Sequence, residues 1–115
     1  MSKIKLIINN DSKKKGKEKF FIKKELQCIL NLYAKMVSNG SWKDYSFSTG
    51  VKEVSFDVYQ RSSEKPVIRI TKNLKPSYFN EKYFIKDKDG IVIMKSENLN
   101  YLIKKTSWNK LKLIN

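Results

Sequence analysis

Few side chains in the sequence are suited to catalysis. The chain has no histidine and a single cysteine, Cys28. The carboxylates of Glu25 and Asp44 stand isolated, and the hydroxyls of Ser62 and Ser63 have no neighbouring base. An enzyme needs a nucleophile, an acid or base, or a metal, and zinc sites draw on several histidines or cysteines. The sequence therefore predicts a protein that is not an enzyme and uses no metal or cofactor.

One acidic segment has the form of a metal loop but a simpler interpretation. Asp87-x-Asp89-Gly90 resembles the start of a calcium loop, which would also need further ligands and a distal glutamate. The residues that follow, Ile91–Met94, are apolar and are expected inside the fold. The segment therefore predicts a hairpin turn with Gly90 at a positive φ angle.

The two arginines are the most informative basic residues. The chain has 23 lysines but only Arg61 and Arg69, so an arginine indicates a need for its planar guanidinium. In a structural interpretation, Arg69 pairs across strands with Asp57, and Arg61 pairs with Glu64 in a turn. Exposed pairs of this kind contribute at most about 1 kcal/mol each.

A functional interpretation of the same region stays open. Tyr59, Arg61 and Arg69 share one face of a predicted hairpin, and Lys72 follows closely. Together these residues would form a patch that contacts phosphates or bases.

A second candidate contact follows the first predicted helix, at Trp42, Lys43 and Tyr45. Aromatic residues at this position can pack over the helix end, which is a structural role. Alternatively they are exposed anchors, because aromatic residues dominate binding hot spots and stack on bases.

The net charge indicates a polyanionic partner but has a competing explanation. The 115 residues carry a net charge of +14, of which residues 1–19 contribute +5. Lysine-rich proteins bind nucleic acid through phosphate neutralisation. However, 60 residues are of types with A/T-rich codons, against nine with G/C-rich codons, so genome bias also produces lysine. Two hypotheses remain: a module that binds nucleic acid or a ribonucleoprotein, and a domain that binds an acidic protein.

Hydrophobic periodicity predicts an α+β fold. Apolar residues at helical spacing predict a helix over 22–37 that ends at Ser38-Asn39-Gly40, and a second helix that begins with Ser96 as its cap. Between them, alternation predicts antiparallel strands near 42–47, 54–59, 68–71, 83–86 and 91–94, with a further short strand at 110–113. The expected architecture is a two-layer sandwich in which both helices pack on one face of a sheet of three to five strands.

Composition along the chain predicts one domain. Residues 1–19 are polar and basic and are expected to be flexible, and residues 20–115 form the domain. No apolar run is long enough for a membrane span. The free cysteine and the lack of an export signal indicate a cytoplasmic protein.

Two blocks of residues carry a family resemblance over roughly 20–114. They read Phe21-x-Lys23-x-Glu25-Leu26-x-x-Ile29-Leu30-x-x-Tyr33-x-x-Met36-Val37-x-x-Gly40-x-Trp42-Lys43-Asp44-Tyr45 and Arg61-Ser62-Ser63-Glu64-Lys65-Pro66-x-x-Arg69-Ile70-x-Lys72. This pattern resembles the alphaproteobacterial family known as domain of unknown function 2794. Lysine stands at 23 and 43, where the resemblance leads us to expect arginine. The family has no assigned activity, so the resemblance implies none.

Overall fold

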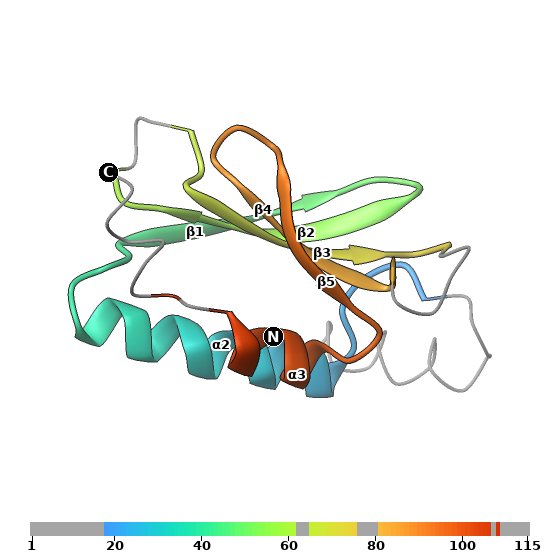
Figure 1. Cartoon of the computed structure of the whole chain (residues 1–115), viewed down its shortest axis with the longest axis horizontal. Helices are drawn as coiled ribbons and strands as arrows, with labels where there is room; N and C mark the ends of the chain where they lie inside the picture. Colours follow the sequence, from blue (N-terminus) through green and yellow to red (C-terminus); the bar gives the residue numbers. More distant parts are fainter. Residues whose placement is uncertain (1–17, 62–64, 76–80, 107, 109–115) are drawn as a thin grey trace.

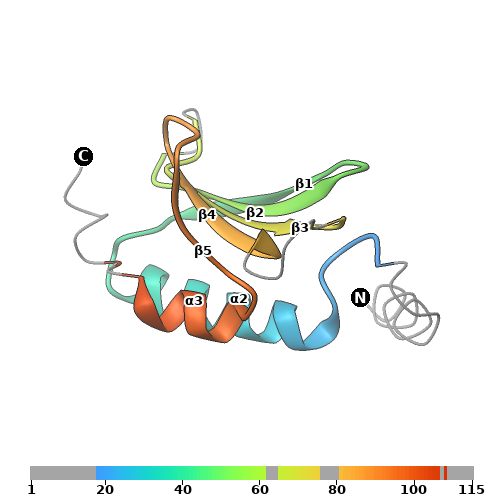
Figure 2. The ribbon, with the colours of Figure 1, turned by 45° about the vertical axis from the view of Figure 1, so that its right-hand side comes forward.

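Five antiparallel strands and two helices build the protein in two layers. The computed structural model describes residues 18–61, 65–75, 81–106 and 108. In chain order the elements are α2 (Lys23–Ser38), β1 (Asp44–Thr49), β2 (Glu53–Tyr59), β3 (Ile68–Asn73), β4 (Tyr83–Asp87), β5 (Val92–Ser96) and α3 (Leu99–Lys105). The strands lie in the sheet in chain order. Both helices lie on the same face of the sheet (Figures 1 and 2), so the predicted α+β sandwich is confirmed.

Alternation along the central strands places the core between the sheet and the helices. Val54, Phe56 and Val58 of β2 are fully buried. On β3, the buried Ile70 pairs with Phe56 and the buried Ile68 pairs with Val58. These are the residues that the period of two assigns to the core. The opposite face of the sheet, which we call the outer face, carries the intervening residues.

Helix α2 ends as predicted but is rotated relative to the expected core stripe. Its C-cap is Asn39, and Gly40 adopts a φ of +84°, a conformation that glycine reaches at little cost. The buried side of the helix consists of Glu25, Ile29, Leu32 and Met36. Five apolar residues of the predicted stripe over 22–37 are instead half-buried or exposed: Ile22, Leu26, Leu30, Tyr33 and Val37.

The turn at Asp87-Lys88-Asp89-Gly90 is a hairpin turn, as predicted. The Asp87 carboxylate accepts hydrogen bonds from the backbone N–H groups of Asp89 (2.9 Å) and Ile91 (3.0 Å), and Gly90 has a φ of +81°. The expectation that the following residues lie inside is wrong. Ile91, Val92 and Ile93 are exposed, because β5 is an edge strand and its tip extends past the helices.

Helix α3 begins later than predicted. Its N-cap is Asn98, whose side chain accepts a hydrogen bond from Tyr101 N–H at 2.9 Å. Ser96 belongs to β5 and accepts a hydrogen bond from Asn98 N–H through its hydroxyl, so it supports the turn before the helix rather than capping it. The predicted strand at 110–113 and residues 1–17 lie outside the described residues. None of the described helices is long and apolar enough to cross a membrane.

Candidate functional site

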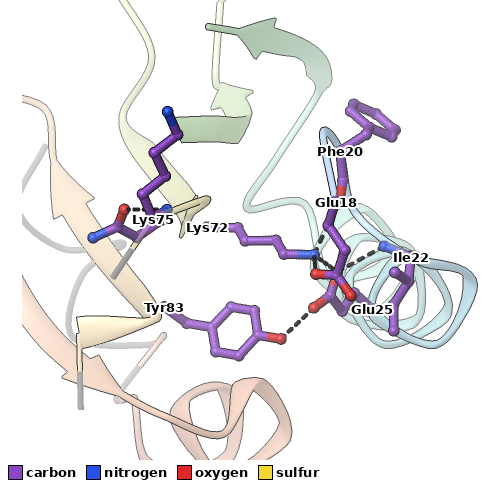
Figure 3. Close-up of polar contacts among 8 residues, drawn as sticks. Glu18, Phe20, Ile22, Glu25, Lys72, Lys75 and Tyr83 are labelled. Carbon is purple, nitrogen blue, oxygen red and sulfur yellow. Dashed lines mark hydrogen bonds and ion pairs between the residues drawn. The ribbon is translucent and has the colours of Figure 1, made fainter. Parts of the chain in front are cut away.

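A charged cluster lies between the sheet and the start of α2 (Figure 3). Lys72, predicted as part of an exposed binding patch, is 1% exposed and points toward the helix. This prediction is wrong because Lys72 pairs with Val54 on β2 and Tyr83 on β4, two residues of the helix-facing side. Arg69 lies an odd number of positions away and therefore faces the other side of the sheet.

The ammonium group of Lys72 gathers oxygen atoms from the segment that leads into α2. Its Nζ lies 2.9 Å from Glu25 Oε1 and 2.6 Å from Glu18 Oε1, and it donates to the Phe20 carbonyl at 3.0 Å. One buried cation therefore meets two carboxylates and a backbone carbonyl. The result is a set of charge-assisted bonds that joins β3 to the residues before the helix.

Tyr83 and the backbone complete the cluster around Glu25. The Tyr83 hydroxyl donates to Glu25 Oε2, and Ile22 N–H donates to Glu25 Oε1 at 2.7 Å. Burial, followed by this hydrogen bond to Glu25, raises the pKa of Tyr83 well above its usual range. Tyr83 thus stays a proton donor, and both Glu25 oxygens are satisfied. We conclude that the cluster is a structural connection between α2 and the sheet.

The outer face of the sheet confirms the structural account of Arg69. Arg69 Nε lies 3.7 Å from Asp57 Oδ1, and the two residues are directly paired on neighbouring strands. Asp57 is 1% exposed and also accepts hydrogen bonds from the hydroxyls of Ser48 (2.5 Å) and Ser55 (2.7 Å). Arg69 therefore compensates a buried carboxylate.

The remaining residues of the predicted patch are only partly brought together. Tyr59 lies on the outer face, and its hydroxyl is 3.0 Å from Ser46 Oγ. Arg61 is exposed just beyond β2, while its expected partner Glu64 lies outside the described residues. Two further cations of the outer region have acidic partners: Lys86 lies 3.5 Å from Glu53, and Lys95 lies 3.9 Å from Glu81.

In the Trp42-Lys43-Tyr45 segment, one residue is buried and two are exposed. Trp42 is 4% exposed, and its ring packs against Tyr33 at 6.2 Å and Trp108 at 5.6 Å between centroids. Its predicted structural role at the helix end is therefore confirmed. Lys43 and Tyr45 are exposed, and the Lys43 carbonyl accepts a hydrogen bond from the Tyr33 hydroxyl at 3.1 Å.

A groove lies between α2 and α3. Its volume is about 730 Å³, within the range of small-molecule and nucleotide sites. Two lysines, three asparagines and a tryptophan contribute to the wall, and none of the described lining residues is acidic. The lining residues are Cys28, Asn31, Leu32, Lys35, Met36, Asn39, Asn100, Ile103, Lys104, Thr106 and Trp108.

The sequence held no strong sign of this groove. Lys35 and Lys104 lie in the last turns of α2 and α3, where the helix dipole stabilises cations. They are far apart in the chain, and their meeting depends on how both helices pack on the sheet. Nothing in the local sequence distinguishes Asn31 and Asn100 from other polar surface residues. They line the same groove because α2 and α3 pack side by side.

Cys28 contributes to the groove as a packing residue. It is half-buried, and its Sγ lies 3.7 Å from Asn100 Oδ1. Burial raises the pKa of the thiol, and the nearby Lys104 lowers it only in part, which disfavours a reactive thiolate. In the described part of the chain, no group of three or more histidine, cysteine or acidic residues is arranged to hold a metal ion.

Comparison with known proteins gives a family but no relative of known activity. The model of a family described as "Protein of unknown function (DUF2794)" matches residues 19–103. No curated protein and no solved structure matches the chain. The match includes α2, the whole sheet and most of α3, and thus both blocks that carry the resemblance in the sequence. Since it covers well over half of the residues, the chain belongs to the DUF2794 family of proteins of unknown function.

Proposed function

We propose that this protein is a small, non-enzymatic module that binds nucleic acid, alone or in a ribonucleoprotein, through the groove between α2 and α3. The observation that carries the proposal is the lining of that groove: lysines on both helices, amide side chains and an indole, with no carboxylate among its described residues. Sequence-tolerant binding of single strands combines a positive groove with aromatic rings, and these are the same two ingredients.

The distribution of paired and unpaired cations supports this location. Arg69, Lys86 and Lys95 each have an acidic partner, so these three charges of the outer face are compensated within the protein. Lys35 and Lys104 have no acidic side chain within 4 Å among the residues that the structure describes. Their charge is therefore available to phosphates, and no internal ion pair must be broken first.

The other groups of the groove suit a nucleotide chain. The amide of Asn31 and the Nδ2 group of Asn100 can contact sugar and base edges, while Asn39 Oδ1 already accepts a hydrogen bond from Ser41 N–H at 3.0 Å. Trp108 is held in place because its indole N–H donates to the Ile103 carbonyl at 2.9 Å. A fixed ring at the groove wall is a surface on which a base can pack.

A charge-matched pair of double variants tests the location. Lys35→Gln with Lys104→Gln removes two charges from the groove, and Lys88→Gln with Lys95→Gln removes two charges from the β4–β5 hairpin. Binding of mixed-sequence single-stranded RNA and DNA is measured by fluorescence anisotropy between about 50 and 200 mM salt. We expect the groove variant to lower the slope of log affinity against log salt by about 0.7 per lysine, while the hairpin variant leaves it nearly unchanged.

Two outcomes would contradict the proposal at different levels. Lack of any RNA or DNA binding by the unmodified chain at about 50 mM salt would reject the nucleic-acid function. Equal weakening by the two double variants would show that charge acts without a preferred surface, and would reject the groove as the site.

A further inference from the structure

An apolar surface lies along the seam between α2 and β1, away from the α2–α3 groove. We call it the seam patch. Several of its residues are exposed although they are large and apolar: Leu30, Val37 and Tyr45 are each 40% exposed, and Phe47 is 36% exposed. Its full membership is Leu26, Leu30, Tyr33 and Val37 of α2 with Tyr45 and Phe47 of β1.

Ring contacts join the two halves of the seam patch. Tyr33 packs edge-on against Tyr45 at 4.9 Å, and Tyr45 packs against Phe47 at 5.7 Å. Beneath them, Phe56 of the buried core contacts both Tyr45 (5.0 Å) and Phe47 (5.4 Å). The patch is therefore continuous and backed by rigid packing, so a partner would meet a surface that is already ordered.

The strand that borders the seam patch is an edge of the sheet. Within the described ranges, β1 pairs with β2 on one side and with no other strand. One backbone donor of β1, the Tyr45 N–H, is taken by the Asp44 carboxylate. The edge otherwise suits an added strand, the mode of recognition called β-augmentation. Tyr45 and Phe47 are on the helix-facing side, so alternate residues of an added strand would lie over the seam patch.

Charge around the seam patch specifies the partner. Lys19 adjoins Phe20, whose ring contacts Phe47 at 5.2 Å, and Lys23 lies one turn before Leu26. Lys43 immediately precedes β1, and Lys52 follows shortly after its end.

These four lysines are exposed, and none has an acidic side chain within 4 Å in the part of the chain that is described. The acidic residue nearest in sequence, Asp44, accepts a hydrogen bond from Tyr45 N–H at 2.8 Å. The surroundings of the patch are therefore predominantly positive.

From these observations we infer that the seam patch and the free edge of β1 dock an extended, acidic segment of a partner protein. The segment would carry apolar residues at alternate positions and Asp or Glu at its ends. Apolar contact would supply affinity, and the lysines at the ends of β1 would select an acidic sequence. A second copy of this chain fits poorly, since two molecules of net charge +14 repel each other.

A synthetic peptide tests this inference directly. The probe spans the six residues of β1, with leucine at alternate positions between terminal pairs of glutamate, and its control has lysine in place of each glutamate. Binding is followed by the amide signals of the isotope-labelled protein in solution NMR. We expect the glutamate peptide to shift the signals of Asp44–Thr49, and the lysine peptide to bind at least about tenfold more weakly.

Two single variants with the same change in charge separate the seam patch from other apolar surfaces. Leu30→Glu alters the patch, and Ile91→Glu alters the exposed tip at the opposite edge of the sheet. Both positions are exposed, so both variants should fold. We expect Leu30→Glu to weaken the glutamate peptide about tenfold and Ile91→Glu to change it by less than about twofold.

Four results would overturn the inference, of which three concern the peptides and the variants. They are the absence of shifts in β1, equal binding of the two peptides, and equal effects of the two variants. A concentration-dependent dimer that Leu30→Glu abolishes would also overturn it, by assigning the patch to a second copy. Nucleic-acid binding is a separate measurement: Leu30→Glu and Ile91→Glu should affect it equally, so failure at either site leaves the other interpretable.

Discussion

Replacing the buried lysine is the most demanding test of the charged cluster at the start of α2. Lys72→Met keeps the length of the side chain but removes the ammonium group from a position that is 1% exposed. Glu25, itself 5% exposed, then loses the cation that lies 2.9 Å from its Oε1. Removal of one partner from a buried ion pair leaves an uncompensated charge, so we expect the free energy of unfolding to fall by about 3–5 kcal/mol.

A second lysine of the same chain provides the matched control. Lys95 also faces a glutamate, Glu81, but its side chain is 52% exposed and the two charged atoms are 3.9 Å apart. An exposed pair contributes at most about 1 kcal/mol, because water and salt screen it. Lys95→Met should therefore have little effect. Urea-induced unfolding, followed by tryptophan fluorescence, measures both variants under the same conditions.

A third variant identifies the cause of the loss. Glu25→Gln removes the negative charge, so adding it to Lys72→Met should recover part of the lost stability, and the two effects should not add. If Lys72→Met destabilises the protein no more than Lys95→Met does, the cluster is not a buried ionic connection. If the losses simply add, Lys72 and Glu25 do not act on each other and the reasoning fails.

The remaining predictions concern protonation, backbone conformation and the arginines. Because burial and the bond to Glu25 raise the pKa of Tyr83 above its usual 10.0, the native state keeps a proton that the unfolded chain loses above about pH 10. Stability should fall as the pH rises through that range, and Tyr83→Phe should reduce the fall; an identical pH profile for both proteins would contradict this. Gly40→Ala should cost about 1 kcal/mol in urea unfolding, since φ is +84°, and a neutral effect would reject the C-cap argument. Arg61→Lys with Arg69→Lys preserves the net charge and should leave nucleic-acid affinity within about twofold; a larger loss would make the arginines specific readers.

Elements with strong local periodicity could be predicted from the sequence. The end of α2 at Asn39-Gly40, the central hairpin and the turn at Gly90 all depend on neighbouring residues. The pairing of Arg69 with Asp57 was also within reach, because a regular hairpin fixes which residues are opposite each other. These features need no knowledge of distant parts of the chain.

The sequence-based predictions are wrong where burial depends on the whole fold. Lys72 is close to Arg69 in sequence, but a strand period of two places the two side chains on opposite faces of the sheet. Its partner Glu25 is 47 positions away, and no local pattern links them. Ile91–Ile93 look like a core strand but are exposed, because the helices do not cover the tip of the edge hairpin.

The groove and the seam patch show the same dependence on distant contacts. The sequence assigned the apolar residues of α2 to one stripe, but the helix is turned so that Leu30 and Val37 remain exposed beside β1. Glu25 lies on the buried side of α2 together with Ile29, Leu32 and Met36, and it bonds there to Lys72 and Tyr83. The position of both proposed binding surfaces depends on this orientation of α2.

The structure separates the lysines that have acidic partners from those that have none. Codon bias can multiply lysines, but it does not decide which of them find a carboxylate after folding. Lys72 is buried and bound to Glu25, and on the outer face Arg69, Lys86 and Lys95 each have an acidic partner. The groove and the borders of the seam patch keep lysines without acidic partners in the described part of the chain. We therefore propose that the excess charge acts at these two places, where it lies beside aromatic or apolar surface.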